Sequence, residues 1–340
     1  MRGRHADGKR GAARALVILI LLFGLLGTGA GSFYLWATGA SGLSRPVTVV
    51  IPRGVTAAEV SEILVRAGVV RSALAFRLVA RLQGATIQAG EYDLRTNIRP
   101  QEALDALSRG PAPEETVTLT IPEGLRVDQV AERVGGVFPI EPQAFLRDAA
   151  GGGHTLPPYL TKAGKGVEGF LFPKTYEFPP DPDADAVIER LLRQFEEEAG
   201  ALPWERADRL GLKPYQVVIV ASLIEREARV DRDRGKIASV IYNRLREGMR
   251  LQIDATVQYA LPEHKPRLTY QDYEYESPYN TYLHDGLPPT PIASPGLASL
   301  EAALRPASTD FLFYIALEDG SHRFTETYEE FLRVKDEVQG

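Results

Sequence analysis

Two segments of the chain share one pattern, in which a short apolar run leads into a turn and then into an amphipathic stretch. Residues 47–55 (VTVVIPRGV) align with residues 117–125 (VTLTIPEGL) at an offset of 70 positions. A run of β-branched residues that ends in Pro-x-Gly is typical of a strand that stops at a turn. Apolar residues then recur at helical spacing, at 60, 63 and 64 and again at 127, 130, 131 and 134. We therefore predict a strand, a turn and a helix in each segment.

The stretch between the two copies completes a small module. Residues 89–94 (AGEYDL) indicate another strand, and residues 100–107 (PQEALDAL) another helix. Two copies are too few for a solenoid, so each is interpreted as part of a compact α+β unit. Such a unit either grips a polymer or serves as a spacer that positions another domain, and the sequence leaves both alternatives open for the first copy.

A long apolar run precedes these modules. Residues 15–37 are 23 positions without a charge, which as a helix at about 1.5 Å per residue would cross a hydrocarbon core of about 30 Å. Cations stand directly before the run, which predicts that the N-terminus stays inside the cell. The alternative is a cleaved signal peptide, whose apolar region is normally only about 7–15 residues long. Both interpretations place the remainder of the chain outside the membrane.

Charge and composition narrow the class of protein. Residues 1–14 form a basic tail with five cations and one acid, which leaves 34 basic and 44 acidic residues beyond, a net charge of −10. So acidic a remainder argues against nucleic acid as a partner, because phosphate binding needs basic surfaces. The absence of cysteine excludes disulfides, cysteine-ligated zinc and a thiol nucleophile.

The most informative helix is predicted over residues 213–228, with Pro214 in its first turn. Glu225 directly follows eight residues, 217–224, of which only Ser222 is polar. Partial desolvation at the end of such a segment favours the protonated carboxyl that a general acid needs. From the residues alone, Glu225 could equally form an exposed i,i+4 ion pair with Arg229, and Glu227 is no less acidic.

Polar groups also gather near turns later in the chain. If residues 251–259 are extended, Gln252, Asp254 and Thr256 lie on one side of a strand. The proline-dense segment 286–296 (GLPPTPIASPG) can be neither helix nor central strand. A stiff loop of this kind would suit the wall of a polymer cleft, or it could be a rigid connector.

Other chemistries lack their motifs. The five histidines are scattered without metal-ligand spacing, so no metal is predicted. No Gly-x-Ser-x-Gly elbow and no phosphate-binding Gly-Lys-Ser/Thr loop occurs, so neither a serine hydrolase nor a nucleotide enzyme is expected. We predict that the protein uses no cofactor.

Five blocks of sequence together resemble one known family, the endolytic murein transglycosylases (YceG-like), over nearly the whole chain. The most specific block is residues 221–227 (ASLIERE), which resembles the catalytic helix of that family. The others are residues 168–176 (EGFLFPKTY), 242–245 (YNRL), 251–259 (LQIDATVQY) and 277–282 (SPYNTY), the last followed by Gly-Leu-Pro-Pro.

The resemblance implies an α+β fold behind a single transmembrane helix at 15–37. It implies a LysM-like module at 46–111 and a catalytic domain at 115–340, which includes the second strand–helix unit near 117–135. The expected location is a bacterial cytoplasmic (inner) membrane, with the catalytic domain on its periplasmic side. The expected partners are peptidoglycan glycan strands, with penicillin-binding peptidoglycan synthases as further candidates.

The resemblance also implies a reaction and its residues. Members of the family cleave the β-1,4 bond between N-acetylmuramic acid (MurNAc) and N-acetylglucosamine (GlcNAc) without adding water and leave a 1,6-anhydro end. The first glutamate of the catalytic helix is their acid/base residue, which corresponds to Glu225. Two alternatives stay open, a hydrolytic muramidase in which Asp254 activates water and a non-catalytic binding or division scaffold. Candidate substrate-binding residues are Glu168, Gln252, Asp254, Tyr279 and Asn280.

Overall fold

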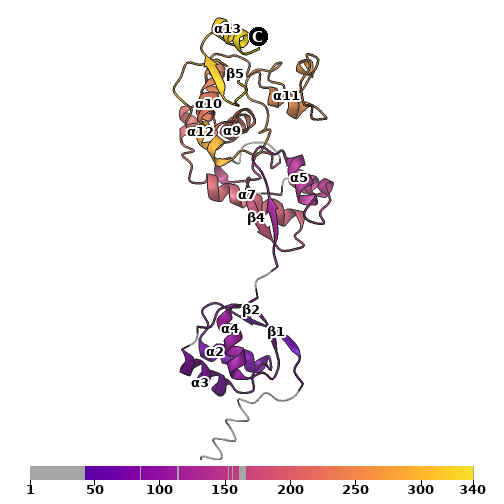
Figure 1. The fold of residues 1–340 in the computed structure, drawn as a ribbon, viewed down its shortest axis with the longest axis vertical. Coiled ribbons are helices and arrows are strands. Elements are labelled where there is room, and N and C mark those ends of the chain that lie inside the picture. Colours follow the sequence, from indigo (N-terminus) through magenta and orange to yellow (C-terminus); the bar gives the residue numbers. More distant parts are fainter. Residues whose placement is uncertain are drawn as a thin grey trace, which may run out of the picture. The chain divides into compact units, whose positions relative to one another are not determined.

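The computed structural model describes residues 43–84, 86–112, 115–151, 153–154, 156–160 and 166–339. The described residues form two compact units, which divide between residues 114 and 115 and are drawn in Figure 1. The apolar run at 15–37 lies outside the described residues. Within the described ranges, every helix is too short or too polar to cross a membrane.

The first unit is a two-stranded antiparallel sheet packed with three helices (Figure 1). Strands β1 and β2 pair along their full length, with Pro46 opposite Arg95 and Ile51 opposite Gly90. Helix α2 begins at a capping box, in which Thr56 and Glu59 each bond the backbone N–H of the other. The elements are β1 (Pro46–Ile51), α2 (Ala57–Arg66), α3 (Ala73–Gln83), β2 (Gly90–Arg95) and α4 (Pro100–Arg109).

This unit has a hydrophobic core of its own. The alternation of β1 turns Val49 and Ile51 inward, where they meet apolar side chains from every other element of the unit. The strands and helices predicted for residues 47–107 are confirmed, and α3 is an additional helix that the sequence pattern did not indicate. The buried core residues include Leu64, Phe76, Tyr92, Leu94, Leu104 and Leu107.

The second unit is predominantly helical and contains two more antiparallel strand pairs, β3 with β4 and β5 with β6. The mixed α+β class is therefore confirmed. Its elements are β3 (Val117–Thr120), α5 (Val127–Gly135), α6 (Pro142–Ala150), η1 (Pro158–Leu160), β4 (Thr175–Phe178), α7 (Ala184–Ala199), α8 (Arg206–Arg209), α9 (Pro214–Glu227), α10 (Asp231–Arg246), α11 (Asp254–Ala260), η2 (Asp272–Glu274), α12 (Leu297–Leu304), β5 (Phe313–Ala316), β6 (His322–Thr325) and α13 (Tyr328–Gln339).

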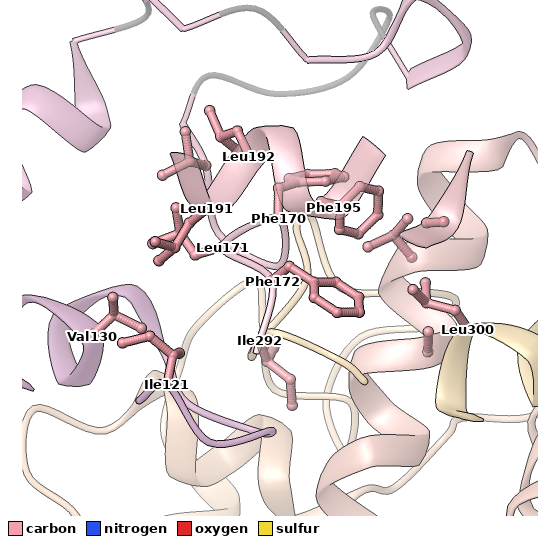
Figure 2. Close-up of a cluster of buried hydrophobic side chains, with 14 of the residues drawn as sticks. Ile121, Val130, Phe170, Leu171, Phe172, Leu191, Leu192, Phe195, Ile292 and Leu300 are labelled. Carbon is pink, nitrogen blue, oxygen red and sulfur yellow. The ribbon is translucent and has the colours of Figure 1, made fainter. Parts of the chain in front are cut away.

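Helix α9 is the buried centre of this unit. Residues 217–224 are all buried, and α10 and α12 pack against the helix (Figure 1). Next to it, the apolar part of the 168–176 block fills the core. Figure 2 shows Phe170 beside Phe195 of α7. The two rings meet edge to face, with their centroids 5.2 Å apart. The core therefore holds α9 along its buried length.

The condition that residues 251–259 are extended is not met, because residues 254–260 form helix α11. Thr281 holds the start of this helix. Its hydroxyl accepts the Ile253 N–H at 3.0 Å and lies 2.9 Å from the Thr256 hydroxyl. Gln252 takes a positive φ of 50°, which turns the chain just before the helix. The polar residues at 252, 254 and 256 therefore do not share one side of a strand.

Candidate active site

Glu225 lies in the last turn of α9, with only 7% of its side chain exposed. Its Oε2 accepts the backbone N–H of Gly296 at 3.0 Å. Its Oε1 accepts a bond from Nη1 of Arg234 at 3.4 Å, and the same nitrogen donates to the Ser299 hydroxyl at 2.7 Å. The cation that pairs with Glu225 is thus Arg234 of α10 rather than Arg229 of the i,i+4 alternative.

The turn after β3 is tied to the end of α9. Gly124 has φ +76°, a conformation that favours glycine. Its N–H donates to the Ser294 carbonyl at 2.9 Å, and the Ser294 N–H donates back to the Leu125 carbonyl at 2.8 Å. Nη1 of Arg226 donates to the Gly124 carbonyl at 3.0 Å. These bonds hold the Pro-x-Gly turn of the second repeat beside the candidate site.

That turn brings a second carboxylate to the site. Glu123 lies against Gly296 so closely that a Cβ added there would be 1.8 Å from its Oε1. Gly296 therefore has one carboxylate beside its Cα and another on its N–H. Glu123 as a whole residue is exposed, but partial burial of its carboxyl and the charge of Glu225 raise the pKa of Glu123, and Arg234 opposes that shift.

The proline-dense loop 286–296 has no helix or strand, as predicted, and it runs along α9. The Ile292 N–H donates to the buried Ser222 hydroxyl at 3.1 Å, and that hydroxyl donates to the Ile219 carbonyl at 2.7 Å. Ser222, the one polar residue of the buried segment, thus fastens the loop to the helix. The loop then delivers the Gly296 N–H to Glu225.

A cavity of about 910 Å³ lies at the other end of α9 from Glu225. It is bounded by Tyr215, Gln216 and Ile219 of the helix and by residues 286–289 of the same loop. Because these residues are six or more positions from Glu225 along α9, we do not assign this cavity to the bond-breaking site.

Glu227, the other acid of the motif, belongs to a separate cluster. It accepts the Tyr314 hydroxyl at 3.0 Å, and burial raises its pKa to about 7, with the nearby charge of Asp254 adding to the shift. Asp254 in turn accepts the hydroxyls of Tyr282 at 2.6 Å and Tyr273 at 3.3 Å. The structure therefore places Asp254 with Glu227 and the tyrosines.

Glu168 caps a helix. Both of its oxygens lie 3.2 Å from the Val127 N–H at the start of α5, and Oε2 also accepts the Tyr259 hydroxyl at 3.2 Å. The ring centroid of Tyr259 is 4.7 Å from that of Tyr279, whose hydroxyl lies 2.9 Å from that of Thr290. Burial raises the pKa of Glu168 to about 7. Glu168 and Tyr279 thus belong to one connected group.

The two remaining sequence candidates shape a loop. Asn280 is fully buried, and its Nδ2 donates to the carbonyls of Tyr273 and Tyr275 at 3.0 and 2.9 Å. Gln252 is exposed, and its N–H donates to the Thr281 carbonyl at 3.1 Å. The substrate-binding roles of Glu168, Gln252, Asp254, Tyr279 and Asn280 stay predictions.

Sequence reasoning missed the groups that bond Glu225 in the described chain, Arg234 and the Gly296 N–H, and it missed Glu123. The sequence contains one indication that Glu123 is special, because the second Pro-x-Gly turn carries an acid where the first carries Arg53. The sequence contains no such indication for Arg234, because this residue meets Glu225 only through the packing of α10 on α9.

One histidine cluster could hold a metal ion. His154, Asp185 and Glu189 place their candidate ligand atoms within 4.8 Å of one another. Nδ1 of His154 is 2.9 Å from Oε1 of Glu189 and 3.7 Å from Oδ1 of Asp185. A protonated imidazole would satisfy the same two carboxylates, so the geometry is also that of a plain ion-paired group.

Two of the raised carboxyl pKa values, those of Glu168 and Glu227, predict a pH-dependent stability. Glu168 and Glu227 have pKa values of about 7 in the fold and ordinary values near 4.5 when unfolded. Between these values the folded state binds more protons, so the free energy of unfolding should fall as pH rises from about 4.5 to 7. Each group contributes at most about 1.4 kcal/mol per pH unit.

Urea unfolding of the purified protein at pH 5, 6, 7 and 8 measures this slope. The Glu168→Gln, Glu227→Gln double variant should have a flatter profile, because neither amide titrates. A double variant with the slope of the wild type would contradict the assignment of the dependence to these two groups.

Taken together, the fold and the site define an α+β protein whose central helix ends in a largely desolvated carboxylate, held by a cation and a backbone N–H and flanked by a second acid. That arrangement is suited to general acid–base chemistry on a glycosidic bond. The profile of the YceG-like family matches residues 49–337. The chain belongs to the YceG-like family.

Individual relatives agree with this assignment. The chain is 34% identical to a Bacillus subtilis protein named endolytic murein transglycosylase, over 85% of this chain and 84% of that one. It is 31% identical to a protein of the same name from Streptococcus pneumoniae, over 79% of this chain and 54% of that one. A solved YceG-like protein from Listeria monocytogenes is similar at a TM-score of 0.58 and 33% identity, covering 86% of this chain and all of that one.

Proposed function

We propose that this chain is an endolytic murein transglycosylase, which cuts peptidoglycan glycan strands internally at MurNAc-β-1,4-GlcNAc bonds. The observation that carries the proposal is the setting of Glu225, a carboxylate held at the end of a buried helix by Gly296 and Arg234. The names of the Bacillus and Streptococcus relatives supply the substrate. Cutting nascent strands in this way would limit their length.

In the first step, Glu225 donates its proton to the glycosidic oxygen as the bond from that oxygen to C1 of MurNAc breaks. The GlcNAc side leaves as an alcohol, and C1 becomes electron-deficient. The N-acetyl group of the same sugar stabilises this centre, so no protein nucleophile is required. The Gly296 N–H and Arg234 fix the direction of the carboxylate and stabilise the anion that forms on Glu225.

In the second step, Glu225 acts as a base. It takes the proton of the MurNAc 6-hydroxyl while O6 bonds to C1, which closes the 1,6-anhydro ring. Glu225 regains the proton that it gave away, and no water is consumed. One carboxylate therefore serves both halves of the reaction.

We further propose the placement of the chain in the cell. Residues 15–37 would anchor it in the bacterial cytoplasmic membrane, with the basic tail inside and the catalytic domain, residues 115–340, on the periplasmic side. What supports this is the 23-residue uncharged run and the cations before it. Residues 46–111 would be a LysM-like module, and peptidoglycan synthases would be partners at the growing strand.

The reaction is tested by digesting peptidoglycan with the full chain in detergent and analysing the products by mass spectrometry. We expect fragments from within strands that end in anhydro-MurNAc. Reducing MurNAc ends, which borohydride converts to muramitol, would instead mean hydrolysis. Glycan binding without cleavage by the folded protein would favour a scaffold.

The placement can be tested by labelling, because the chain contains no cysteine. An Ala6→Cys variant and an otherwise matched Glu62→Cys variant each carry a single thiol. In intact spheroplasts, a membrane-impermeant maleimide should label Glu62→Cys and should label Ala6→Cys only after lysis. Equal labelling of both variants before lysis would contradict the proposed topology.

A further inference from the structure

Two carboxylates, those of Glu123 and Glu225, lie next to Gly296. We propose that Glu123 is a positioning residue, whose negative charge keeps the proton on Glu225 against the pull of Arg234. This inference rests on the proposed function, since it concerns how Glu225 stays protonated until that reaction begins.

Glu225 on its own has a poor environment for a general acid. Nη1 of Arg234 lies 3.4 Å from its Oε1, and the Gly296 N–H lies 3.0 Å from its Oε2. A cation and a hydrogen-bond donor both favour the ionised carboxylate. The reaction must nevertheless begin with a protonated Glu225. A negative charge nearby would favour that protonated form and oppose the effect of Arg234.

Glu123 supplies that charge when it is ionised, and a bonded turn holds its backbone beside the site. The turn is bonded to Ser294 and to Arg226, so the backbone at Glu123 cannot move away from the end of α9 without breaking these bonds. Gly296 has no side chain at the position where a Cβ would meet the Glu123 carboxylate at 1.8 Å. The absence of a Cβ at Gly296 therefore lets the two acids approach from either side of one residue.

The other charged groups at the site do not remove this effect. Asp231 accepts a bond from Nε of Arg234 at 3.3 Å and so partly neutralises that cation. Arg226, on α9 itself, donates to the Gly124 carbonyl. The 294–296 loop and α12 contribute uncharged groups, the Gly296 N–H and the Ser299 hydroxyl. Glu123 and Asp231 thus disfavour the ionised form of Glu225, whereas Arg234 and Arg226 favour it.

The coupling of the two acids is reciprocal. The charge of Glu225 contributes to the raised pKa of Glu123, after the larger effect of burial. By the same interaction, an ionised Glu123 disfavours the ionised form of Glu225. It also makes the Glu225 anion, once formed, a stronger base toward the MurNAc 6-hydroxyl. The charge of Glu123, when that group is ionised, therefore assists both steps.

The test is the pH profile of kcat/KM for glycan cleavage by the full chain, comparing wild type with Glu123→Gln. The alkaline limb reports loss of the proton from the general acid. We expect the variant to move this limb to lower pH by about one unit, which lowers kcat/KM about tenfold above the limb and little below it. Glu123→Asp keeps the charge, so its alkaline limb should lie close to that of the wild type.

Glu132→Gln is the matched control, because it removes one charge from an exposed position on α5 of the same unit. It should leave the limb unmoved. An equal shift in this control, or a uniform fall at every pH in Glu123→Gln, would overturn the proposal in favour of a bulk-charge or packing effect.

A second readout does not depend on catalysis. Carbon-13 NMR of labelled glutamate carboxyls, with the Glu225 signal assigned from its absence in Glu225→Gln, should show the Glu225 titration midpoint falling by about one unit in Glu123→Gln. An unmoved midpoint overturns the role of Glu123 and leaves the proposed reaction standing. An inactive wild type with the midpoint shift intact would instead contradict the reaction and support the coupling.

Discussion

Glu225→Gln should lose at least about a thousandfold in kcat, because general acid–base catalysis contributes roughly 10²–10⁴-fold and this one carboxyl serves both proton transfers. The amide cannot protonate the leaving oxygen or accept the proton of the 6-hydroxyl. Its carbonyl oxygen can still accept the Gly296 N–H, so the local structure should persist. The rate of anhydro-end formation on purified peptidoglycan measures the loss, and circular dichroism checks the fold.

Glu227→Gln is the informative companion, since it makes the same change two residues along the same helix. Glu227 bonds Tyr314 rather than the groups around Gly296, so this variant should lose far less activity than Glu225→Gln. If the order of the two losses were reversed, the acid/base role would belong to Glu227 and the assignment made here would be wrong.

Gly169→Ala should cause a large loss of stability in the second unit. Gly169 has φ +86°, and a Cβ there would lie 2.4 Å from the Cβ and 2.6 Å from the Cγ of Pro291. The strained backbone costs about 1–3 kcal/mol, and the collision adds a similar amount. At roughly 2–4 °C per kcal/mol for a unit of this size, Tm should fall by about 5–15 °C.

The same substitution should also reduce activity. Pro291 adjoins Ile292, whose N–H is bonded to Ser222, and displacing this part of the loop would disturb the Gly296 N–H farther along. Gly211→Ala separates the two causes, because Gly211 has φ +75° with nothing within 4 Å of an added Cβ. The Tm of Gly211→Ala should therefore fall only by the amount that the strained backbone causes. Equal Tm losses in the two variants would mean that the contact with Pro291 contributes nothing.

Much of the local structure follows from the sequence because its determinants are local. The Pro-x-Gly turns and the apolar run of α9 each lie within a few residues of the element that they specify. The end of α9 at Glu227 likewise lies within the motif that suggested Glu225. In such places, spacing alone was a sufficient guide.

The rest of the site depends on contacts between distant segments. Arg234 and Glu123 reach Glu225 through helix packing and a turn bonded to Ser294, neither of which periodicity can reveal. Residues 251–259 are a second example. Their partial alternation was compatible with a strand, whereas the bonds of Thr281 to Ile253 and Thr256 start a helix. Local pattern was overruled there by a partner 25 positions away.

Cleavage of purified glycan strands in water enriched in ¹⁸O tests the central mechanism most directly, because it asks whether water enters the product. With the wild-type full chain, every new MurNAc end should be a 1,6-anhydro sugar without ¹⁸O, and Glu225→Gln should form no such ends above background. New ends that carry one ¹⁸O atom, or undiminished anhydro ends from Glu225→Gln, would contradict lytic cleavage by Glu225.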